Sequence, residues 1–385
     1  MDSFSKLLEP YALCASCLRR LAKGAQGAVT SHEAVVAKDC WLCHGLLDEV
    51  PRFAALIEAA VAGYEFGSFL VGCKVDEELL SREAFLWQKL GLQGEPMKME
   101  VNREVGKLLE SRLGKPADFS HPDIVAMIDT CFDVVSLQIS SLYVYGRYRK
   151  YSREIPQTKW PCRICHGLGC RSCGLVGKMY ATSVEELIAV PLLTIAQGTD
   201  HAFHGCGRED IDARMLGTGR PFVVEVKNPR KRGVDLDRLR LEINASAAGL
   251  IEAMQLRPGS KQDIERLKHA EYRKVYHVLL EMGTPIPKER FIKTVQGLRG
   301  ATIQQFTPTR VAHRRAHKTR ARTVYRCEVE SVADTRAQLT IETESGTYIK
   351  EFVSGDGGKT QPNLSDMLGT PCVVRELDVL DVKGE

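Results

Sequence analysis

The segment HAFHGCGREDIDARMLGTGRPFVVEVKN (201–228) combines glycines, ionisable side chains and the start of an apolar strand. Its glycines, at 205, 207, 217 and 219, bracket the charged residues Arg208, Glu209, Asp210, Asp212, Arg214 and Arg220. The run PFVVEV (221–226) then predicts a strand. Acids packed among arginines on a glycine-rich loop at the mouth of a sheet indicate a carboxylate that is held ionised and aimed at a ligand. By composition alone, a structural salt-bridge network explains the cluster at least as well.

Downstream of this segment the chain is rich in predicted strands. The strand-like runs are KVYHVLLEM (274–282), RTVYRCEVESV (322–332), AQLTIETES (337–345), GTYIKEFV (346–353) and CVVRELDVLDV (372–382). Together with 221–226 they predict that the second half of the chain is rich in strands.

Upstream, helical and strand patterns alternate between residues 45 and 155. The expected elements are a strand at SFLVGCKV (68–75), two helices between Ser81 and Leu113 broken near Gly91 to Pro96, a helix at PDIVAMIDTCFDVV (122–135), and a strand pair at VSLQISSLYVYGRYRKY (135–151). This order predicts a compact module that mixes helices and strands. The fold class expected for the whole chain is therefore α+β.

Eight of the thirteen cysteines fall in four Cys-x-x-Cys pairs. The pairs form two sets, Cys14, Cys17, Cys40 and Cys43, and, within CRICHGLGCRSC, Cys162, Cys165, Cys170 and Cys173. Each set supplies four thiolates, which bind zinc in a tetrahedral structural site and leave no open coordination position for catalysis. The alternatives are redox-active dithiols or incidental cysteines. We expect two structural zinc sites and no organic cofactor.

Length, composition and charge exclude several classes of protein. The 385 residues suffice for two or three domains, and the fractions of 44% hydrophobic and 26% charged residues are typical of soluble globular proteins. No run approaches the roughly 20 apolar residues that span a bilayer, and the N-terminus lacks the pattern of a signal peptide. We expect a cytoplasmic monomer that does not bind membranes.

Three familiar catalytic motifs are absent from the sequence. The run GDGGKT (355–360) lacks the earlier glycine of a phosphate-binding loop, since position 353 is Val353. No G-x-G-x-x-G lies between a strand and a helix, and no His-Glu-x-x-His occurs. A nucleotide cofactor, Rossmann-type methyl transfer and zinc-dependent hydrolysis are therefore disfavoured. Lys359, within the first run, is expected to contact RNA phosphate instead.

Two basic stretches indicate a polyanionic partner. From Lys288 to Arg326 there are eleven Lys or Arg residues and one acid, Glu289. Phosphate binding explains this bias economically, and a merely solvated loop is the alternative. The shorter stretch 145–151 interleaves aromatic and basic residues, which suits contacts with RNA bases and phosphates. A strand end with snorkelling side chains explains it equally well.

The motif Gly-Arg-Glu-Asp at 207–210 resembles the Gly-Arg-Xaa-Asp catalytic loop of pseudouridine synthases. The wider run GREDIDARMLGTGRPF is similar to the tenth pseudouridine synthase family, the archaeal and eukaryotic enzymes that act on the TΨC arm of tRNA. QISSLYVYGRYRKYSREIPQTKW (138–160) resembles the end of that family's THUMP-containing RNA-binding region. TPTRVAHRRA (307–316) and GTYIKEFVSGDGGKTQPNLSDMLG (346–369) resemble its other hallmarks. The insert CRICHGLGCRSC is similar to archaeal members, and residues 45–120 match the family loosely.

The resemblance implies a cofactor-independent isomerisation of uridine to pseudouridine. Asp210 would attack or stabilise the ribosyl carbon of a flipped uridine, and Asp212 is the alternative nucleophile. Tyr276 would stack on the target uracil and could take its proton, although by pattern alone it is a core aromatic. Lys350 would pair with the catalytic aspartate and lower its pKa.

The resemblance further implies tRNA as the partner and a division into four regions. These are an N-terminal helical zinc-binding region (1–50), a THUMP-like RNA-binding domain (51–158), a second four-cysteine zinc motif and linker (159–180), and a catalytic domain with the pseudouridine synthase fold (181–385). The fold implied for this last domain is a large mixed, mainly antiparallel sheet with the active cleft across it. The residues expected to contact RNA are Arg147, Arg149, Arg208, Arg310, His313, Arg314, Arg315, Tyr348 and Lys359. The alternative function is a non-catalytic, zinc-stabilised tRNA-binding module or chaperone. Whether uridine 54, uridine 55 or both are modified stays open.

Overall fold

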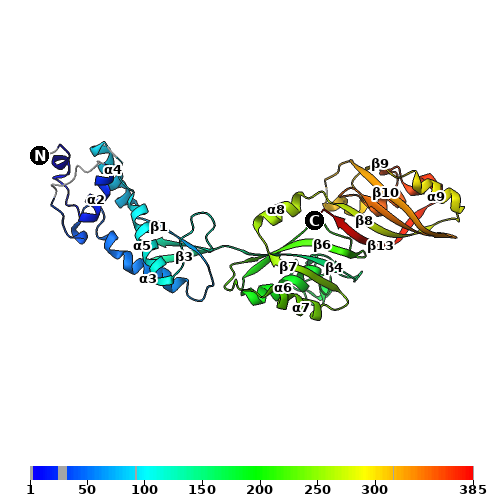
Figure 1. Ribbon diagram of the computed structural model, residues 1–385, viewed down its shortest axis with the longest axis horizontal. Coiled ribbons are helices and arrows are strands. Elements are labelled where there is room, and N and C mark those ends of the chain that lie inside the picture. The colour runs from blue at the N-terminus through cyan, green and yellow to red at the C-terminus, as the bar shows by residue number, and fades with distance from the viewer. Residues whose placement is uncertain (1–2, 25–32, 92, 315, 385) are drawn as a thin grey trace. The chain divides into compact units, whose positions relative to one another are not determined.

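The protein forms two compact units in a computed structural model, which describes residues 3–24, 33–91, 93–314 and 316–384 (Figure 1). The first unit comprises Met1–Ser141 with the short segments Ala196–Gly198 and Lys227–Gly233. The second comprises Leu142–Ile195, Thr199–Val226 and Val234–Glu385.

The first unit contains helices and three strands in its described part. In chain order they are α1 (Ser3–Leu8), α2 (Ala15–Gly24), the 3-10 helices η1 (Ala37–Asp39) and η2 (Leu46–Glu49), α3 (Val50–Ala60), β1 (Phe69–Lys74), α4 (Glu77–Leu90), α5 (Met97–Leu113), β2 (Ile124–Asp129) and β3 (Val134–Ile139). β2 is the central strand, parallel to β1 and antiparallel to β3. Helices α3 and α5 pack on one face of this sheet.

The two-helix prediction for 81–113 is confirmed, and the chain shows why the break occurs. Gly91 ends α4 in the left-handed conformation, with φ of 62°, and Pro96 precedes the first residue of α5. A helix predicted at 122–135 is wrong. Ile124, Ala126 and Ile128 alternate into the core of the sheet as β2, so strand pairing with β1 overrides the local helical pattern.

Helix α2 joins the first unit through a buried ionic network. Arg20 is buried, and its guanidinium pairs with Glu83 of α4 and, at 3.2 Å, with Glu100 of α5. The same Glu83 accepts a hydrogen bond from the backbone N of Met97 at 2.8 Å. Because a buried charge without its partner is strongly destabilising, α2 and the α4–α5 pair depend on each other.

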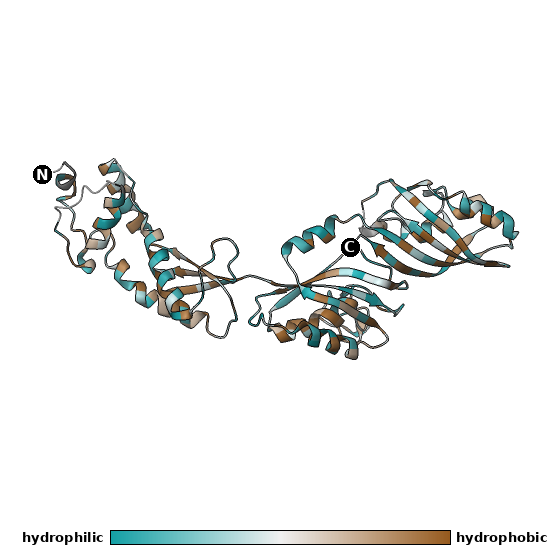
Figure 2. Cartoon of the chain, in the orientation of Figure 1, coloured by the Kyte–Doolittle hydropathy of each residue, from teal (hydrophilic) through white to brown (hydrophobic). Residues whose placement is uncertain are grey.

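The second unit is built on one large sheet. Its elements are β4 (Leu142–Lys150), η3 (Arg171–Cys173), α6 (Val184–Ala196), β5 (Asp200–Gly205), β6 (Arg214–Lys227), α7 (Leu236–Ser246), β7 (Ile251–Pro258), α8 (Lys261–His269), β8 (Arg273–Met282), α9 (Lys288–Gln296), β9 (Thr302–Gln305), η4 (Thr309–Arg314), β10 (Arg320–Ala333), β11 (Arg336–Thr343), α10 (Ile349–Ser354), β12 (Thr360–Gln361), α11 (Leu364–Leu368) and β13 (Cys372–Lys383). Figure 2 shows brown and teal alternating along its strands, and along β8 every second residue is buried.

Ten strands form this sheet within the described residues, and the predicted mixed, mainly antiparallel α+β architecture is confirmed. The strand order is β12-β9-β10-β11-β8-β13-β6-β4-β7, with β5 paired to β6. The parallel contact is a short seam between β13 and β6, where Asp378 lies opposite Arg214 and Val379 opposite Met215. β13 thereby joins the β8 half of the sheet to the β6 half.

Two local expectations change in the second unit. GTYIKEFV, predicted as a strand, forms the start of helix α10, which begins after Tyr348 and ends at Gly355, where φ is 82°. Its buried face, Ile349, Phe352 and Val353, packs toward β13. The strands predicted at 135–151 exist, but β3 pairs with β2 of the first unit and β4 lies between β6 and β7 of the second.

The division between the units follows from β4. The chain passes from one unit to the other at Ser141 and Leu142, whereas the sequence placed the end of the RNA-binding domain at 158. β4 is hydrogen-bonded on both sides by β6 and β7, so it is a central strand of the second sheet. In the described parts of both units, every helix is too short or too polar to cross a bilayer.

Candidate functional site

Asp210 lies in the loop between β5 and β6, on the wall of a pocket of about 510 Å³. The same pocket is lined by Tyr276 from β8, Lys350 from α10 and Arg310 from η4. Three residues expected to be catalytic, Asp210, Tyr276 and Lys350, thus meet in one cavity although up to 140 positions separate them in the sequence. The pocket also has an apolar wall, formed by Leu377 and Val379. A salt-bridge network on the surface, the alternative explanation of this charged cluster, would not need such a wall.

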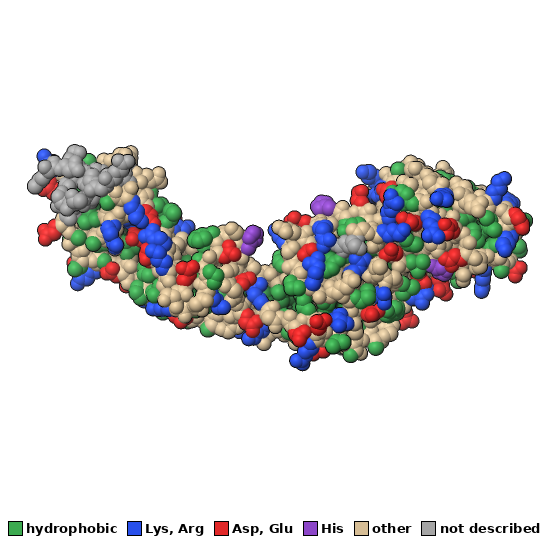
Figure 3. Space-filling view, in the orientation of Figure 1, with side chains coloured by type: hydrophobic (Ala, Val, Ile, Leu, Met, Phe, Trp, Pro, Cys, Tyr) green, Lys and Arg blue, Asp and Glu red, His purple; other side chains and the backbone are tan. Residues whose placement is uncertain are grey.

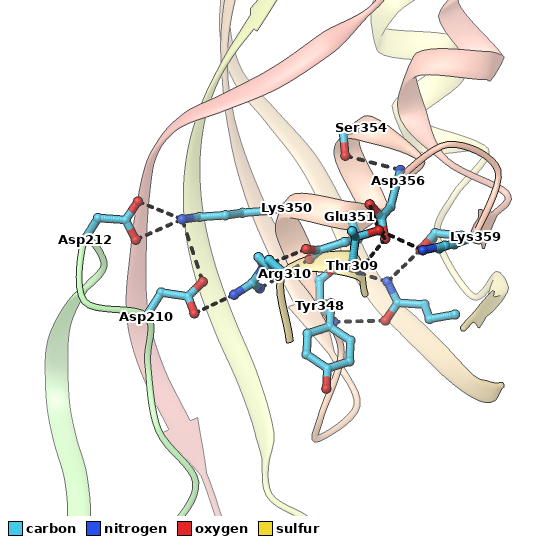
Figure 4. A network of polar contacts seen from close by, with 12 residues as sticks. Asp210, Asp212, Thr309, Arg310, Tyr348, Lys350, Glu351, Ser354, Asp356 and Lys359 are labelled. Atoms are coloured by element: carbon cyan, nitrogen blue, oxygen red, sulfur yellow. Dashed lines mark hydrogen bonds and ion pairs between the residues drawn. The ribbon is translucent and has the colours of Figure 1, made fainter. Parts of the chain in front are cut away.

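Two cations hold the carboxylate of Asp210 (Figure 4). Arg310 Nη1 lies 2.7 Å from Asp210 Oδ1, and Lys350 Nζ lies 3.7 Å from Asp210 Oδ2. Lys350 is closer to Asp212, at 2.7 Å. Burial opposes ionisation of Asp212, but the hydrogen bond and charge of Lys350 lower its pKa overall. Lys350 therefore bridges both aspartates, and Arg310, expected only as an RNA contact, is the nearer partner of Asp210.

Glu351 fixes the orientation of Arg310. Its buried carboxylate accepts a hydrogen bond of 2.6 Å from Arg310 Nε, so the guanidinium forks between Glu351 and Asp210. Lys359 donates at 2.7 Å to Thr309, the residue before Arg310, and Thr309 also hydrogen-bonds Asp356. The segment carrying Arg310 is thereby tied to α10 and the loop that follows it (Figure 4).

A buried polar network supports the Asp210 loop from beneath. Glu209 forms an ion pair of 2.9 Å with the buried Arg220 and accepts a 2.9 Å hydrogen bond from the hydroxyl of Tyr148. Arg220 also donates to the carbonyl O of Cys206 at 2.8 Å, and Gln157 donates to that of Gly207 at 2.9 Å. The residue before the candidate nucleophile is thus locked into the sheet, which fixes the position of the next.

Lys150 contributes a second support to this loop. The residue is fully buried, and its Nζ donates to three backbone carbonyls, of Ile211 at 2.8 Å, Ile155 at 3.1 Å and Asp210 at 3.2 Å. Burial lowers the pKa of Lys150, partly offset by nearby acids, of which Glu209 contributes most. Sequence reasoning missed both Lys150 and the Glu209 network. The one sequence feature that could have pointed to Glu209 is its position as the variable residue of the Gly-Arg-Xaa-Asp motif.

We expect Lys150→Met to lower the rate of any reaction at this pocket by about 10- to 100-fold, because three carbonyls lose their donor and the Asp210 backbone is released. Affinity for RNA should change by less than about threefold, since Lys150 does not reach the pocket. Single-turnover kinetics and an equilibrium binding curve measure the two effects. Lys261→Met, at an exposed lysine of α8, is the matched control and should change neither. An equal loss of rate in Lys150→Met and Lys261→Met would contradict a positioning role for Lys150.

Tyr276 is 7% exposed and lines the pocket from β8. Burial raises the pKa of its phenol to about 12, with Arg220 acting against the rise and Asp210 adding to it. The side chain is therefore an uncharged phenol at neutral pH. It presents an aromatic surface beside the two cations.

The other predicted RNA contacts fall into three groups. Arg208 is exposed and lines the pocket, and Tyr348 lies on its wall with its ring pointing away from Asp210 and Asp212 (Figure 4). His313 and Arg314 have side chains outside the described part of the structure, and Arg315 lies outside the described residues. Lys359 makes the contact with Thr309 given above.

Arg147 and Arg149 do not reach the pocket. Arg147 is buried, and its guanidinium donates to the carbonyl oxygens of Thr218 and Gly219 at 2.7 and 2.9 Å. Arg149 donates to Gly217 and pairs with Glu252 at 3.1 Å. Contact of Arg147 with RNA stays a prediction, and in the structure its guanidinium is occupied by these two backbone acceptors.

The basic stretch gains acidic partners in three dimensions. Arg310 pairs with Glu351, Arg322 with Glu344 at 2.9 Å, and Arg326 with Glu328. On the face seen in Figure 3, blue and red side chains are interspersed over the second unit. The bias read from the sequence is thus partly neutralised by residues from neighbouring elements.

Both sets of cysteines form compact clusters. Within each, the four Sγ atoms lie within 4.8 Å of one another. Cys14 and Cys43 are 3.7 Å apart, and in the second set Cys162–Cys170 and Cys165–Cys173 are each 3.9 Å apart. Four sulfurs about 2.3 Å from a zinc ion would be about 3.8 Å from each other, so both clusters fit the metal.

Backbone amides favour thiolates in the second cluster. The N–H groups of Cys170 and Gly177 each donate to Cys173 Sγ at 3.2 Å, and together they lower the pKa of that thiol to about 6, against an opposing effect of burial. The two chain segments that flank this cluster are joined by a hydrogen bond of 3.0 Å from the backbone N of Met179 to the carbonyl O of Trp160. Trp160 and Gln157 line a second pocket beside Asp210, so the cysteine cluster lies next to the site.

Comparisons with known proteins agree along nearly the whole chain. The family described as Pus10, C-terminal matches residues 143–383, and the Pus10 THUMP domain, archaeal, matches residues 53–129. A tRNA pseudouridine synthase Pus10 from Methanothrix thermoacetophila is 43% identical over 97% of this chain and 81% of its own. One from Halorubrum lacusprofundi is 42% identical over 92% and 85%. A solved Cbf5-Nop10-Gar1 complex overlaps 51% of this chain and 44% of its own, at 17% identity and a TM-score of 0.33.

Proposed function

Since this chain belongs to the Pus10 family of tRNA pseudouridine synthases, we propose that it isomerises uridine 54, uridine 55 or both in the TΨC arm of tRNA, with Asp210 as the nucleophile. The observation that carries the proposal is the meeting of Asp210, Tyr276, Arg310 and Lys350 in one pocket. A binding module would gain nothing from a carboxylate placed where it repels RNA phosphate.

The proposed reaction needs no added atom or electron. Asp210 attacks or stabilises the ribosyl C1′ as the C1′–N1 bond breaks, the uracil rotates, and a C5–C1′ bond forms. The proton on C5 is lost, and N1 gains one. Arg310 and Lys350 orient the carboxylate of Asp210 through their ion pairs with it, and the ring of Tyr276 supports the detached uracil by stacking.

We further propose that each cysteine cluster holds a structural zinc ion. Cys14, Cys17, Cys40 and Cys43 would hold one ion in the core of the first unit. Cys162, Cys165, Cys170 and Cys173 would hold the other beside Trp160. Four thiolates leave no position for substrate, so the metal supplies stability only.

The partner of this site is tRNA. Positive charge for binding the phosphates around the flipped nucleotide comes from the exposed Arg208 at the pocket and from basic residues of the 307–326 stretch. Base flipping costs a few kcal/mol, which phosphate contacts offset. We propose that the protein acts as a monomer in the cytoplasm, where tRNA is used.

The direct test is pseudouridine mapping on an unmodified tRNA transcript incubated with the purified protein alone. We expect pseudouridine at position 54, 55 or both and at no other uridine of the transcript. Transcripts with cytidine at 54, at 55 or at both show which position is used. Binding of the transcript without any pseudouridine would favour the non-catalytic tRNA-binding module.

A further inference from the structure

Lys274 is a buried amine on the wall of the Asp210 pocket, and the isomerisation leaves it without a role. It precedes Tyr276 by two residues on β8, so both side chains face the same side of the sheet. The residue is 8% exposed. Its Nζ donates to two neutral acceptors, the carbonyl O of Tyr272 at 3.2 Å and Ser345 Oγ at 3.1 Å.

The charge of Lys274 has no acidic partner among the described residues. The ionisable groups facing it are Arg220 from β6, Arg322 from β10 and the thiol of Cys206. Burial, and next the charge of Arg220, lower the pKa of Lys274 to about 8. Arg220 and Arg322 each have an acidic partner, Glu209 and Glu344. The buried charge of Lys274 has none among the described residues and is unfavourable unless an anion joins it, and Lys274 lines the pocket.

Gly207 leaves space beside Lys274 that a bound group can enter. A Cβ on Gly207 would lie 3.4 Å from Arg220 Nη1 and 4.0 Å from Lys274 Cε, so the missing side chain leaves room between the two cations. Gly207 has a φ of 72°, which favours glycine there. Ser345 adds a hydroxyl at the same end of the pocket.

From this arrangement we propose that Lys274 binds a backbone phosphate of the RNA next to the target uridine. The inference rests on the proposed function and adds a subsite to it. Two residues along β8 span about 6.7 Å, which places the amine beyond a pyrimidine stacked on Tyr276 and within reach of its sugar–phosphate backbone. A phosphate supplies the counter-ion that the protein lacks, and Ser345 can donate to it as well.

The test combines Lys274→Met with tRNAs that carry one neutral methylphosphonate linkage, either 5′ or 3′ of the uridine that the wild-type protein converts, or of uridine 55 if it converts none. Each linkage follows a 2′-deoxy residue for stability, and the same deoxy tRNA with ordinary phosphates is its reference. The equilibrium affinity and the single-turnover rate are measured for every combination of protein and tRNA. Affinity keeps the subsite testable if no pseudouridine forms, so failure of the subsite and failure of the proposed function are distinguishable.

We expect Lys274→Met to weaken binding of the reference tRNA by about 10- to 100-fold, as for loss of a charged hydrogen bond. One of the two neutral linkages should weaken tRNA binding to the wild type by the same factor as the mutation does. In Lys274→Met the same linkage should cause no additional loss of affinity. Losses that multiply at both linkages would overturn the proposal. Lys261→Met, at an exposed lysine of α8 outside the lining of this pocket, is the matched control, and its loss should stay below about threefold.

A pH profile separates binding from a structural role. Phosphate binding needs the ammonium form, and a pKa of about 8 means that the free enzyme loses it above that pH. For the wild type we expect kcat/KM to fall above about pH 8, whereas Lys274→Arg, which stays charged, should keep its value to higher pH. A fall at the same pH in both proteins would contradict the subsite.

Discussion

We expect Asp210→Asn to lower the rate of pseudouridine formation by about 10⁴-fold or more, as when a nucleophile is removed from other enzymes. The amide keeps the shape of the carboxylate but cannot attack or stabilise C1′. Affinity for tRNA should change by less than about threefold, because Arg310 remains held by Glu351 and the fold is untouched. Single-turnover conversion of an unmodified transcript measures the first effect, and a binding curve the second.

The matched control is Asp212→Asn, the same chemical change two residues away. Asp212 has a side chain that is 65% exposed, and its partner Lys350 also lies 3.7 Å from Asp210. Removing Asp212 leaves Lys350 to Asp210 alone, so we expect a loss of less than about tenfold. If Asp212→Asn were inactive and Asp210→Asn were not, Asp212 would be the nucleophile. If both lost tRNA affinity in parallel with activity, the two carboxylates would be structural.

The second large effect concerns metal in the first unit. We expect removal of zinc, or Cys40→Ser, to unfold this unit, because structural zinc contributes about 10–16 kcal/mol to small zinc domains, as much as the whole net stability of many domains. The four cysteines belong to the same buried core as Phe53, Ile57 and Ile124. Loss of α2 would also leave Glu83 and Glu100 without Arg20 in a buried setting.

Hydrogen exchange measures this effect locally. Peptides from α2, α5 and the β1–β3 sheet should lose protection in Cys40→Ser and in chelated protein, and regain it in the chelated wild type when zinc returns. Cys73→Ser is the matched control, since Cys73 is a buried cysteine of the same core outside the cluster, and we expect it to cost only about 1 kcal/mol. Unchanged protection in metal-free protein would rule out structural zinc in this unit.

The sequence was most informative where the signal is local. Cys-x-x-Cys pairs place two ligands within one turn of backbone, and both predicted sets form clusters. The Gly-Arg-Xaa-Asp motif located the loop of the pocket. The helix pair at 81–113 was marked by Gly91 and Pro96, which act on their own backbone.

Other features depend on residues far apart in the chain. Arg310 is 100 positions from Asp210, so nothing local shows that it is the nearer cation. Lys150 ends a stretch that looked like a basic strand edge, but it is buried and donates to backbone carbonyls of residue 155 and of residues 210 and 211, which lie far along the chain. The stretch GTYIKEFV is rich in the β-branched and aromatic residues that favour strands, but Glu351 accepts a hydrogen bond from Arg310 and α10 packs toward β13.

The seam between β13 and β6 has a consequence for the order in which the molecule matures on the ribosome. β13 emerges after the other nine strands of its sheet, yet it lies between β8 and β6 at the centre. Until it arrives, the half-sheet next to Asp210 and the half-sheet carrying Tyr276 have no strand between them. Contacts of such high sequence separation form slowly. The nascent chain can therefore fold its first unit well before the pocket is complete, and the pocket is assembled in one late step.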